Sequence, residues 1–161
     1  MSQTEGLEPG EWEFWDDWTT AQRLLARELE RGLQRDHGIS KAEFSVLVRL
    51  WRAPAHTMRV CDLVSALDWE KSRVSHLLTR MEKRGFVARP EGAAGRRTRT
   101  GLTASGRRVA DAALRGHGDT VRRHFFDPLT PEEAATIREW SARTIDRLTP
   151  CEGRADDDGA A

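Results

Sequence analysis

The most informative segment of this chain is residues 70–84, which read Glu70-Lys-Ser-Arg-Val-Ser-His-Leu-Leu-Thr-Arg-Met-Glu-Lys-Arg84. Its apolar residues recur at three- and four-residue steps, which predicts a helix with one buried stripe made of Val74, Leu77, Leu78 and Met81. The opposite face carries Ser72, His76, Thr79 and Lys83, flanked by Arg73, Ser75 and Arg80. Donors and cations of this kind can meet phosphates and base edges in the major groove of DNA.

Two neighbouring segments set this helix apart from an ordinary solvated surface helix. A short helix is predicted over residues 59–67, and a tight connection at residues 66–69 completes a helix-turn-helix. A hairpin is predicted next, with strands at residues 86–91 and 96–102 joined by a turn at 92–95. The return strand carries Arg96, Arg97 and Arg99, and arginines on such an arm favour the DNA backbone and minor groove. Together the three elements predict a winged helix-turn-helix.

Position along the helix separates the expected DNA contacts. The N-terminal half of a recognition helix points towards base edges, so we expect base contacts from Ser72, Arg73 and His76. Phosphate contacts are expected from the later and flanking side chains, Ser75, Thr79, Arg80 and Lys83. Minor-groove or phosphate contacts are expected from the wing residues Arg96, Arg97 and Arg99.

Stop and cap residues in the sequence predict where the helices before residue 70 begin and end. A long helix is predicted over residues 12–36, with Gly38 as its C-terminal stop. Ser40 and Glu43 have the spacing of a capping box, which predicts the start of the next helix. Asp68 is expected to cap the helix that runs to Arg84.

Two more helices are predicted after the hairpin. Thr103 can cap one that runs through residues 106–126. Thr130, Pro131 and Glu133 form a capping box that opens the last helix, which continues towards Pro150. The fold class predicted from the sequence is therefore mainly α.

Length and composition indicate one folded part between two acidic ends. A chain of 161 residues suits a single domain. No apolar run reaches the ~20 residues that a transmembrane helix needs, and the start lacks the features of a signal peptide. We expect disordered acidic ends at residues 1–11 and 151–161, a folded part at residues 12–150, and a cytoplasmic protein that contacts no membrane.

The formal net charge of zero conceals a strongly basic segment. Residues 71–108 carry eleven Lys and Arg side chains against Glu82 and Glu91, whereas residues 1–20 carry six acidic side chains and no Lys or Arg. A charged partner responds to the local field rather than to the sum. The basic segment is therefore the candidate surface for double-stranded DNA.

These motifs resemble those of the MarR family of bacterial transcription regulators. The resemblance covers residues 12–148 and is carried by residues 63–67, by the run from Ser72 to Arg89, and by the run from Arg96 to Gly106. It implies a winged helix-turn-helix at about residues 40–102 and dimerisation helices at about residues 12–37 and 103–149. It further implies a homodimer that represses transcription from a pseudo-palindromic operator.

The wing departs from the family pattern at two positions. Ala94 stands where the family has an Asp that orients the wing arginine, which corresponds to Arg96 here. Thr100 replaces an apolar strand residue. The positive charge of the wing is kept, whereas its geometry does not follow from the resemblance.

Large aromatic residues outside the winged segment have two possible uses. They are Trp12, Phe14, Trp15, Trp18, Phe125, Phe126 and Trp140. They either fill the core of one chain or form an interface between chains, and the resemblance favours the homodimer. It also implies control by a small phenolic or aromatic carboxylate effector, for which Trp18 and Trp51 are candidate lining residues.

The cysteines and histidines predict no metal or cofactor site. We expect Cys61 to be buried as a small hydrophobic residue, and nothing near Cys151 activates its thiol. His117 and His124 lie two helical turns apart, roughly 10 Å, which is too far to hold one metal without other ligands. The chain has no Gly-rich phosphate loop, G-x-S-x-G elbow or H-E-x-x-H motif, so we predict no enzymatic activity.

Two alternatives to a sequence-specific regulator remain open at this point. The winged helix could bind another protein through its basic face, which would give no preference for any DNA sequence. It could also bind DNA without sequence preference as an architectural protein.

Overall fold

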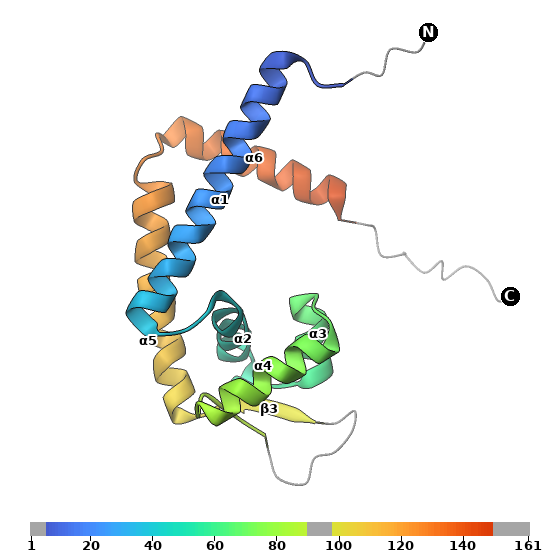
Figure 1. Cartoon of the computed structure of the whole chain (residues 1–161), viewed down its shortest axis with the longest axis vertical. Coiled ribbons are helices and arrows are strands. Elements are labelled where there is room, and N and C mark those ends of the chain that lie inside the picture. Colours follow the sequence, from blue (N-terminus) through green and yellow to red (C-terminus); the bar gives the residue numbers. More distant parts are fainter. Residues whose placement is uncertain (1–5, 90–97, 150–161) are drawn as a thin grey trace, which may run out of the picture. The chain divides into compact units, whose positions relative to one another are not determined.

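The structure, a computed structural model, describes residues 6–89 and 98–149. The chain divides into two compact units, with Arg122 as the last residue of the first and Arg123 as the first of the second. Figure 1 shows the elements of both units along the chain. The predicted wing residues Arg96 and Arg97 lie outside the described residues, and so does Cys151.

Helices make up most of both units, as the sequence predicts. In chain order they are α1 (Pro9–His37), α2 (Lys41–Arg52), α3 (Val60–Leu67), α4 (Lys71–Lys83), α5 (Ala104–Val121) and α6 (Pro131–Leu148). A 3-10 turn (Pro54–His56) follows α2, and a π-helical turn (Arg122–Phe126) follows α5. The helix expected over residues 106–126 therefore changes its hydrogen-bond pattern in its last five residues.

A small antiparallel sheet completes the winged part of the first unit. Its strands β1 (Thr57–Arg59), β2 (Val87–Ala88) and β3 (Arg99–Leu102) lie in the order β1-β3-β2. The pairing of β2 with β3 confirms the base of the predicted hairpin, while β1 is a strand that the sequence analysis missed. Thr100 occupies the buried face of β3, where it is fully covered.

Local capping chemistry fixes the starts of α2, α5 and α6. At α2, the Glu43 backbone N–H donates to the Ser40 hydroxyl and the Ser40 backbone N–H donates to the Glu43 carboxylate. Thr130 and Glu133 form the same reciprocal pair at α6. The Thr103 hydroxyl accepts the backbone N–H of the third residue after it at the start of α5. These contacts confirm the three predicted caps.

The prediction for Asp68 is wrong. Asp68 adopts a left-handed backbone conformation, with φ of 52°, and ends α3 instead of starting α4. Its backbone N–H donates to the carbonyl of Ser65. Glu70 precedes the first residue of α4 instead, without a side-chain cap. An Asp tolerates the left-handed region better than most residues, which explains why it can end a helix.

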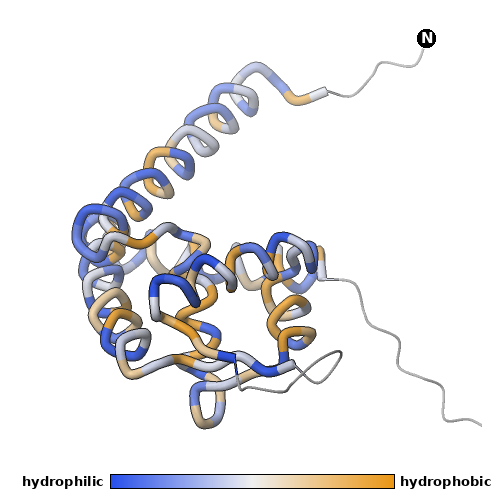
Figure 2. Tube along the Cα trace, turned by 60° about the horizontal axis from the view of Figure 1, so that its bottom comes forward, coloured by the Kyte–Doolittle hydropathy of each residue, from blue (hydrophilic) through white to orange (hydrophobic). Residues whose placement is uncertain are grey.

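The core of the first unit lies where α2, α3, α4, α5 and the sheet meet. Figure 2 shows hydrophobic segments gathered at the centre of this winged part, whereas hydrophilic and hydrophobic residues alternate along α1. Leu47, Leu50 and Leu63 are fully buried there together with the predicted stripe of α4. A Cβ added to Gly106 would lie 1.9 Å from the carbonyl oxygen of Phe86, so α5 can pass the wing this closely because residue 106 is glycine.

Two expectations about burial are decided by the structure. Cys61 is exposed, so the expected burial is wrong, because its side of α3 borders a cavity rather than the core. Many of the aromatic residues do not fill the core of one chain. Trp12, Phe14, Trp15, Phe126 and Trp140 are exposed, while Trp18 and Phe125 are partly covered.

Candidate nucleic-acid interface

The two faces of α4 differ sharply in burial. The stripe of Val74, Leu77, Leu78 and Met81 is buried, as predicted. Every predicted DNA-contacting side chain of this helix is exposed, namely Ser72, Arg73, Ser75, His76, Thr79, Arg80 and Lys83. Burial on one side holds the helix in place, and the other side presents hydroxyls, an imidazole and cations to the solvent.

The turn between α3 and α4 positions Arg73. The guanidinium carbon of Arg73 lies 4.1 Å from the ring centroid of Trp69, which is the geometry of a cation–π contact. Trp69 is half-buried and packs against the hydrophobic core, so its ring is a firm support. This contact restricts the freedom of the Arg73 side chain at the N-terminal end of α4.

Arg89, which follows β2, is a basic residue beside α4 that the sequence analysis did not single out. Its Nη2 lies 3.5 Å from the Thr79 hydroxyl, and its Nε lies 3.8 Å from a carboxylate oxygen of Glu82. Both contacts connect the base of the wing to the middle of α4. Only the high density of basic residues across the segment could have pointed to Arg89, because the contact depends on how strand and helix pack.

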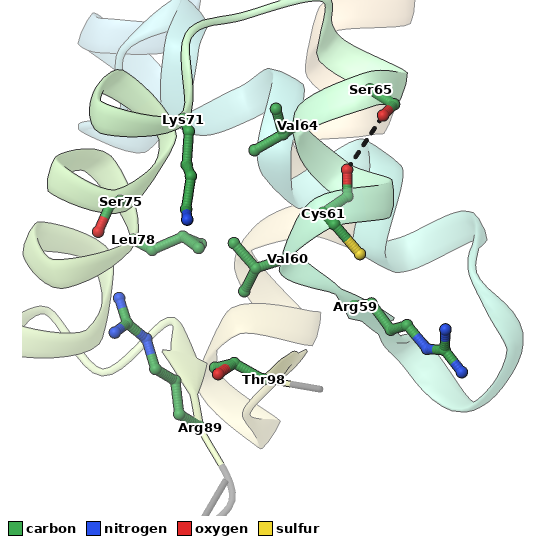
Figure 3. Close-up of a pocket in the computed structure, with 10 residues that line it drawn as sticks. All are labelled: Arg59, Val60, Cys61, Val64, Ser65, Lys71, Ser75, Leu78, Arg89 and Thr98. Carbon is green, nitrogen blue, oxygen red and sulfur yellow. Dashed lines mark hydrogen bonds between the residues drawn. The ribbon is translucent and has the colours of Figure 1, made fainter. Parts of the chain in front are cut away.

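A cavity of about 810 Å³ is lined by residues of α3, of α4 and of the base of the wing. Figure 3 shows side chains from all three elements around it, among them Lys71, Ser75, Cys61 and Arg89. The Cys61 thiol donates to the Asp62 carboxylate at 3.4 Å. The cavity lies beside the exposed face of α4, and three of its lining residues carry positive charge: Arg59, Lys71 and Arg89.

The wing arginine that the structure describes is turned towards β1. Arg99 Nε donates to the Thr57 hydroxyl at 3.1 Å, and its Nη2 donates to the Thr57 carbonyl at 3.4 Å. This side chain is exposed but tethered to the neighbouring strand. The structure therefore separates Arg99 from the contacts made around α4, and its predicted DNA contact stays a prediction.

Arg84, which follows α4, makes contacts within the chain that stabilise the fold. Its guanidinium donates to the Glu43 carboxylate at 2.6 Å and to the Gly38 carbonyl at 2.8 Å. Burial alone raises the pKa of Glu43, but the hydrogen bonds from Ser40 and Arg84 outweigh it and hold that pKa below its ordinary value. The ion pair links the end of α4 to the start of α2, and the hydrogen bond to Gly38 links it to the α1–α2 connection.

The two candidate effector residues lie on different helices. Trp18 is half-buried on α1, and Trp51 is 37% exposed near the end of α2. The cavity beside α4 is lined by other residues. Among the described residues, no group of three or more His, Cys, Asp or Glu could hold a metal ion, and no helix is long and apolar enough to cross a membrane.

Comparisons with known proteins show which family model and which solved structures this chain is similar to. The family model described as MarR matches residues 39–98. A solved structure of AbsC, a MarR family transcriptional regulator from Streptomyces coelicolor, is 32% identical, with a TM-score of 0.79 over 90% of this chain and 98% of that chain. A search of curated proteins gave no match.

Two further solved structures contain DNA. Sco3205, a MarR family transcriptional regulator from Streptomyces coelicolor in complex with DNA, is 33% identical, with a TM-score of 0.79 over 94% of this chain and 96% of that chain. A mutant MarR from E. coli complexed with operator DNA is 20% identical, with a TM-score of 0.68 over 88% of this chain and 99% of that chain. The second likeness shows the shared fold.

Proposed function

Because this chain belongs to the MarR family of transcriptional regulators, we propose that it is a sequence-specific repressor that binds DNA as a homodimer. DNA-binding regulation of transcription is the function of the family to which the chain belongs. The relative Sco3205 has been solved in complex with DNA, and its likeness extends over nearly the whole chain. The observation that carries the proposal is the exposed face of α4 with its hydroxyls and cations.

Each side chain of this face has a proposed role. Ser72, Arg73 and His76 contact base edges, because they lie in the N-terminal half of the helix. Arg73 reads a guanine best, since its guanidinium can pair with two acceptors on that base. The remaining exposed side chains of the face, Ser75, Thr79, Arg80 and Lys83, contact phosphates. Arg96, Arg97 and Arg99 are the proposed contacts of the wing.

The Trp69 ring supports the proposed role of Arg73. An arginine that searches many rotamers loses conformational freedom when it binds a base. The stack at 4.1 Å already limits that freedom, so we propose that Trp69 orients Arg73 for the major groove. Trp69 is then a positioning residue that touches no base.

The homodimer is proposed from uncovered aromatic surface. Trp12, Phe14 and Trp15 are 53%, 71% and 51% exposed near the start of α1. Exposed large apolar side chains gathered in one segment often mark an interface. A two-fold dimer should then recognise two half-sites about one helical turn apart, ~34 Å along the duplex.

The proposed function includes relief of repression by a small effector. We propose a phenolic or aromatic carboxylate effector, with Trp18 and Trp51 among the residues that respond to it. Such a ligand would favour a spacing of the two α4 helices that no longer matches the DNA grooves. A DNA-binding regulator acts where the chromosome is, so we propose a cytoplasmic location.

Selection of bound sequences from a random DNA pool tests the proposed function. A sequence-specific dimer should enrich a pseudo-palindrome with half-sites one turn apart. Enrichment of no sequence, despite salt-sensitive binding, would support an architectural DNA binder instead. Absence of salt-sensitive binding to any duplex would favour the protein-interaction module and overturn the proposal.

A further inference from the structure

A second cavity, of about 410 Å³, lies in the winged part among α2, α3, β1 and β3. Four arginines line it: Arg49 and Arg52 from the last turn of α2, Arg59 from β1, and Arg99 from β3. Asp62 is the acidic residue in its lining. No α4 or β2 residue lines this cavity, which distinguishes it from the cavity beside α4.

The charge of this cavity is not neutralised by the described part of the chain. Arg49, Arg52 and Arg59 form no ion pair with any described Asp or Glu, although Asp62 shares the cavity with them. Arg99 donates to Thr57 and is therefore held in place without losing its charge. Four like charges around one hollow repel one another, so the arrangement favours an anion between them.

Helix dipoles do not explain the whole cluster. Arg49 and Arg52 lie at the C-terminal end of α2, where a cation interacts favourably with the macrodipole. Arg59 immediately precedes α3, at the positive end of that helix, where a cation is unfavourable. An anion in the cavity would meet both the Arg59 guanidinium and the positive end of α3.

The lining of the cavity includes apolar residues, and a strained turn adjoins it. Ala53, Pro54, Met58 and Ala66 contribute the apolar part of the lining. The turn after α2 places Ala55 and His56 at φ of 53° and 55°, and the ring of His56 pairs with the Trp51 carbonyl at 2.8 Å. Two consecutive non-glycine residues at positive φ are strained, and such strain persists only where the surroundings hold it.

We propose that this cavity binds a small organic anion with at least two negative charges, of the phosphorylated or polycarboxylate type. Guanidinium groups pair bidentately with phosphate and carboxylate oxygens, which suits arginines better than lysines to this task. The volume lies within the range of small-molecule sites, ~300–1,000 Å³. A ligand here would touch α2, α3 and β3 at once, and so connect the start of the helix-turn-helix to the wing.

Calorimetric titration of the full chain with inorganic pyrophosphate, and separately with citrate, tests this proposal. Arg49→Gln combined with Arg52→Gln removes two cavity charges from exposed positions, so the fold should be kept. Arg107→Gln combined with Arg108→Gln removes the same charge from exposed positions on α5. We expect one saturable site per chain, affinity at least tenfold weaker in the first variant, and affinity within twofold of the original in the second.

Three results would overturn the proposal. The first is no saturable binding of either anion, and the second is equal loss of affinity in both variants. The third is a cavity variant that loses tenfold in affinity for duplex DNA while pyrophosphate competes with that duplex, because the cavity would then hold the DNA backbone. None of the substituted residues belongs to α4. A failure of α4 to bind DNA would therefore be detected separately, in titrations with duplex DNA.

Discussion

Helix α4 and the start of α1 both leave a face uncovered, yet the chemistry of the two faces differs. The face of α4 presents hydroxyls, an imidazole and cations. The start of α1 presents Trp12, Phe14 and Trp15. Water solvates the first face well, and phosphates attract it further. Water solvates the second poorly, which favours contact with another protein surface.

The two helices also differ in how one chain holds them. Four side chains anchor α4 in the core, whereas the buried residues of α1 are Gly32 and Leu33 near its C-terminal end. The part of the fold that one chain completes by itself is therefore the part that we propose meets DNA. For the start of α1 we propose a partner chain that covers its aromatic side chains. Exposure alone does not distinguish a DNA-binding face from a protein interface, whereas the residue types do.

The largest expected effect lies on the α1 side of this comparison. Trp12→Ser combined with Trp15→Ser should raise the dimer dissociation constant about a thousandfold, since two interface aromatics at about 2 kcal/mol each amount to about 4 kcal/mol. Sedimentation equilibrium measures this constant. Glu13→Gln combined with Asp17→Asn changes polar residues of the same segment and should leave it nearly unchanged. Equal effects of both variants would contradict an aromatic interface.

The next effect separates the two faces of α4. Met81→Ala removes a fully buried side chain and should lower the free energy of unfolding by about 3 kcal/mol. Lys83→Ala, two residues later on the exposed face, should change it by less than about 0.5 kcal/mol. Urea denaturation followed by circular dichroism measures both. A loss in Lys83→Ala as large as in Met81→Ala would show that this face also supports the fold.

A smaller effect distinguishes base contacts from phosphate contacts. Arg73→Ala should cost about 2 kcal/mol on the selected operator and relax its sequence preference, because a base contact is lost. Lys83→Ala should weaken binding to all duplexes alike and reduce the salt slope by about 1. Titrations at matched salt concentrations measure both quantities. Unchanged discrimination between operator and scrambled duplex in Arg73→Ala would exclude the proposed base contact.

The smallest expected effect is a pH dependence of stability that arises on α5, the helix that packs against both α1 and α2. His117 on α5 lies with its ring 4.7 Å from that of Phe44, and burial, followed by the charge of Lys41, lowers its pKa from the ordinary value of 6.5. The folded state then prefers the neutral ring, and the unfolded chain takes up the proton first as pH falls. The free energy of unfolding should therefore decrease as pH falls below about 6.5.

A substitution isolates this histidine from the other titrating groups. Glu43 also loses stabilising contacts at lower pH, as its depressed pKa is approached. His117→Gln should flatten the part of the pH profile just below 6.5 and leave the more acidic part in place. His124→Gln changes an exposed histidine and should leave both parts unchanged. An identical profile in His117→Gln and in the original chain would remove His117 from this account.

Features set by local chemistry were predictable from the sequence. The caps at Ser40, Thr103 and Thr130 follow from side chains three residues apart, and the buried stripe of α4 follows from helical periodicity. The prediction for Asp68 is wrong because the same residue type can start one helix or end another. That choice depends on the backbone conformation of the turn, which local sequence does not specify.

Features set by packing were not predictable. Strand β1 has three residues and exists through its pairing with β3, about forty residues later. Cys61 is exposed because a cavity, rather than the core, lies beside its face of α3. The contact of Arg89 with α4 and the stack of Arg73 on Trp69 likewise arise from the folded arrangement.

Lysine footprinting tests most directly whether the exposed face of α4 meets DNA. The chain has three lysines, all exposed: Lys71 and Lys83 bound α4, while Lys41 starts α2, where its charge acts on His117 of α5. Acetylation of the free protein and of its complex with the selected operator, followed by mass spectrometry, gives a rate for each. We expect the rate at Lys83 to fall at least about fivefold on DNA binding, with Lys41 unchanged, since a phosphate contact blocks the amine. Equal acetylation of Lys83 in the free and bound protein would contradict the account.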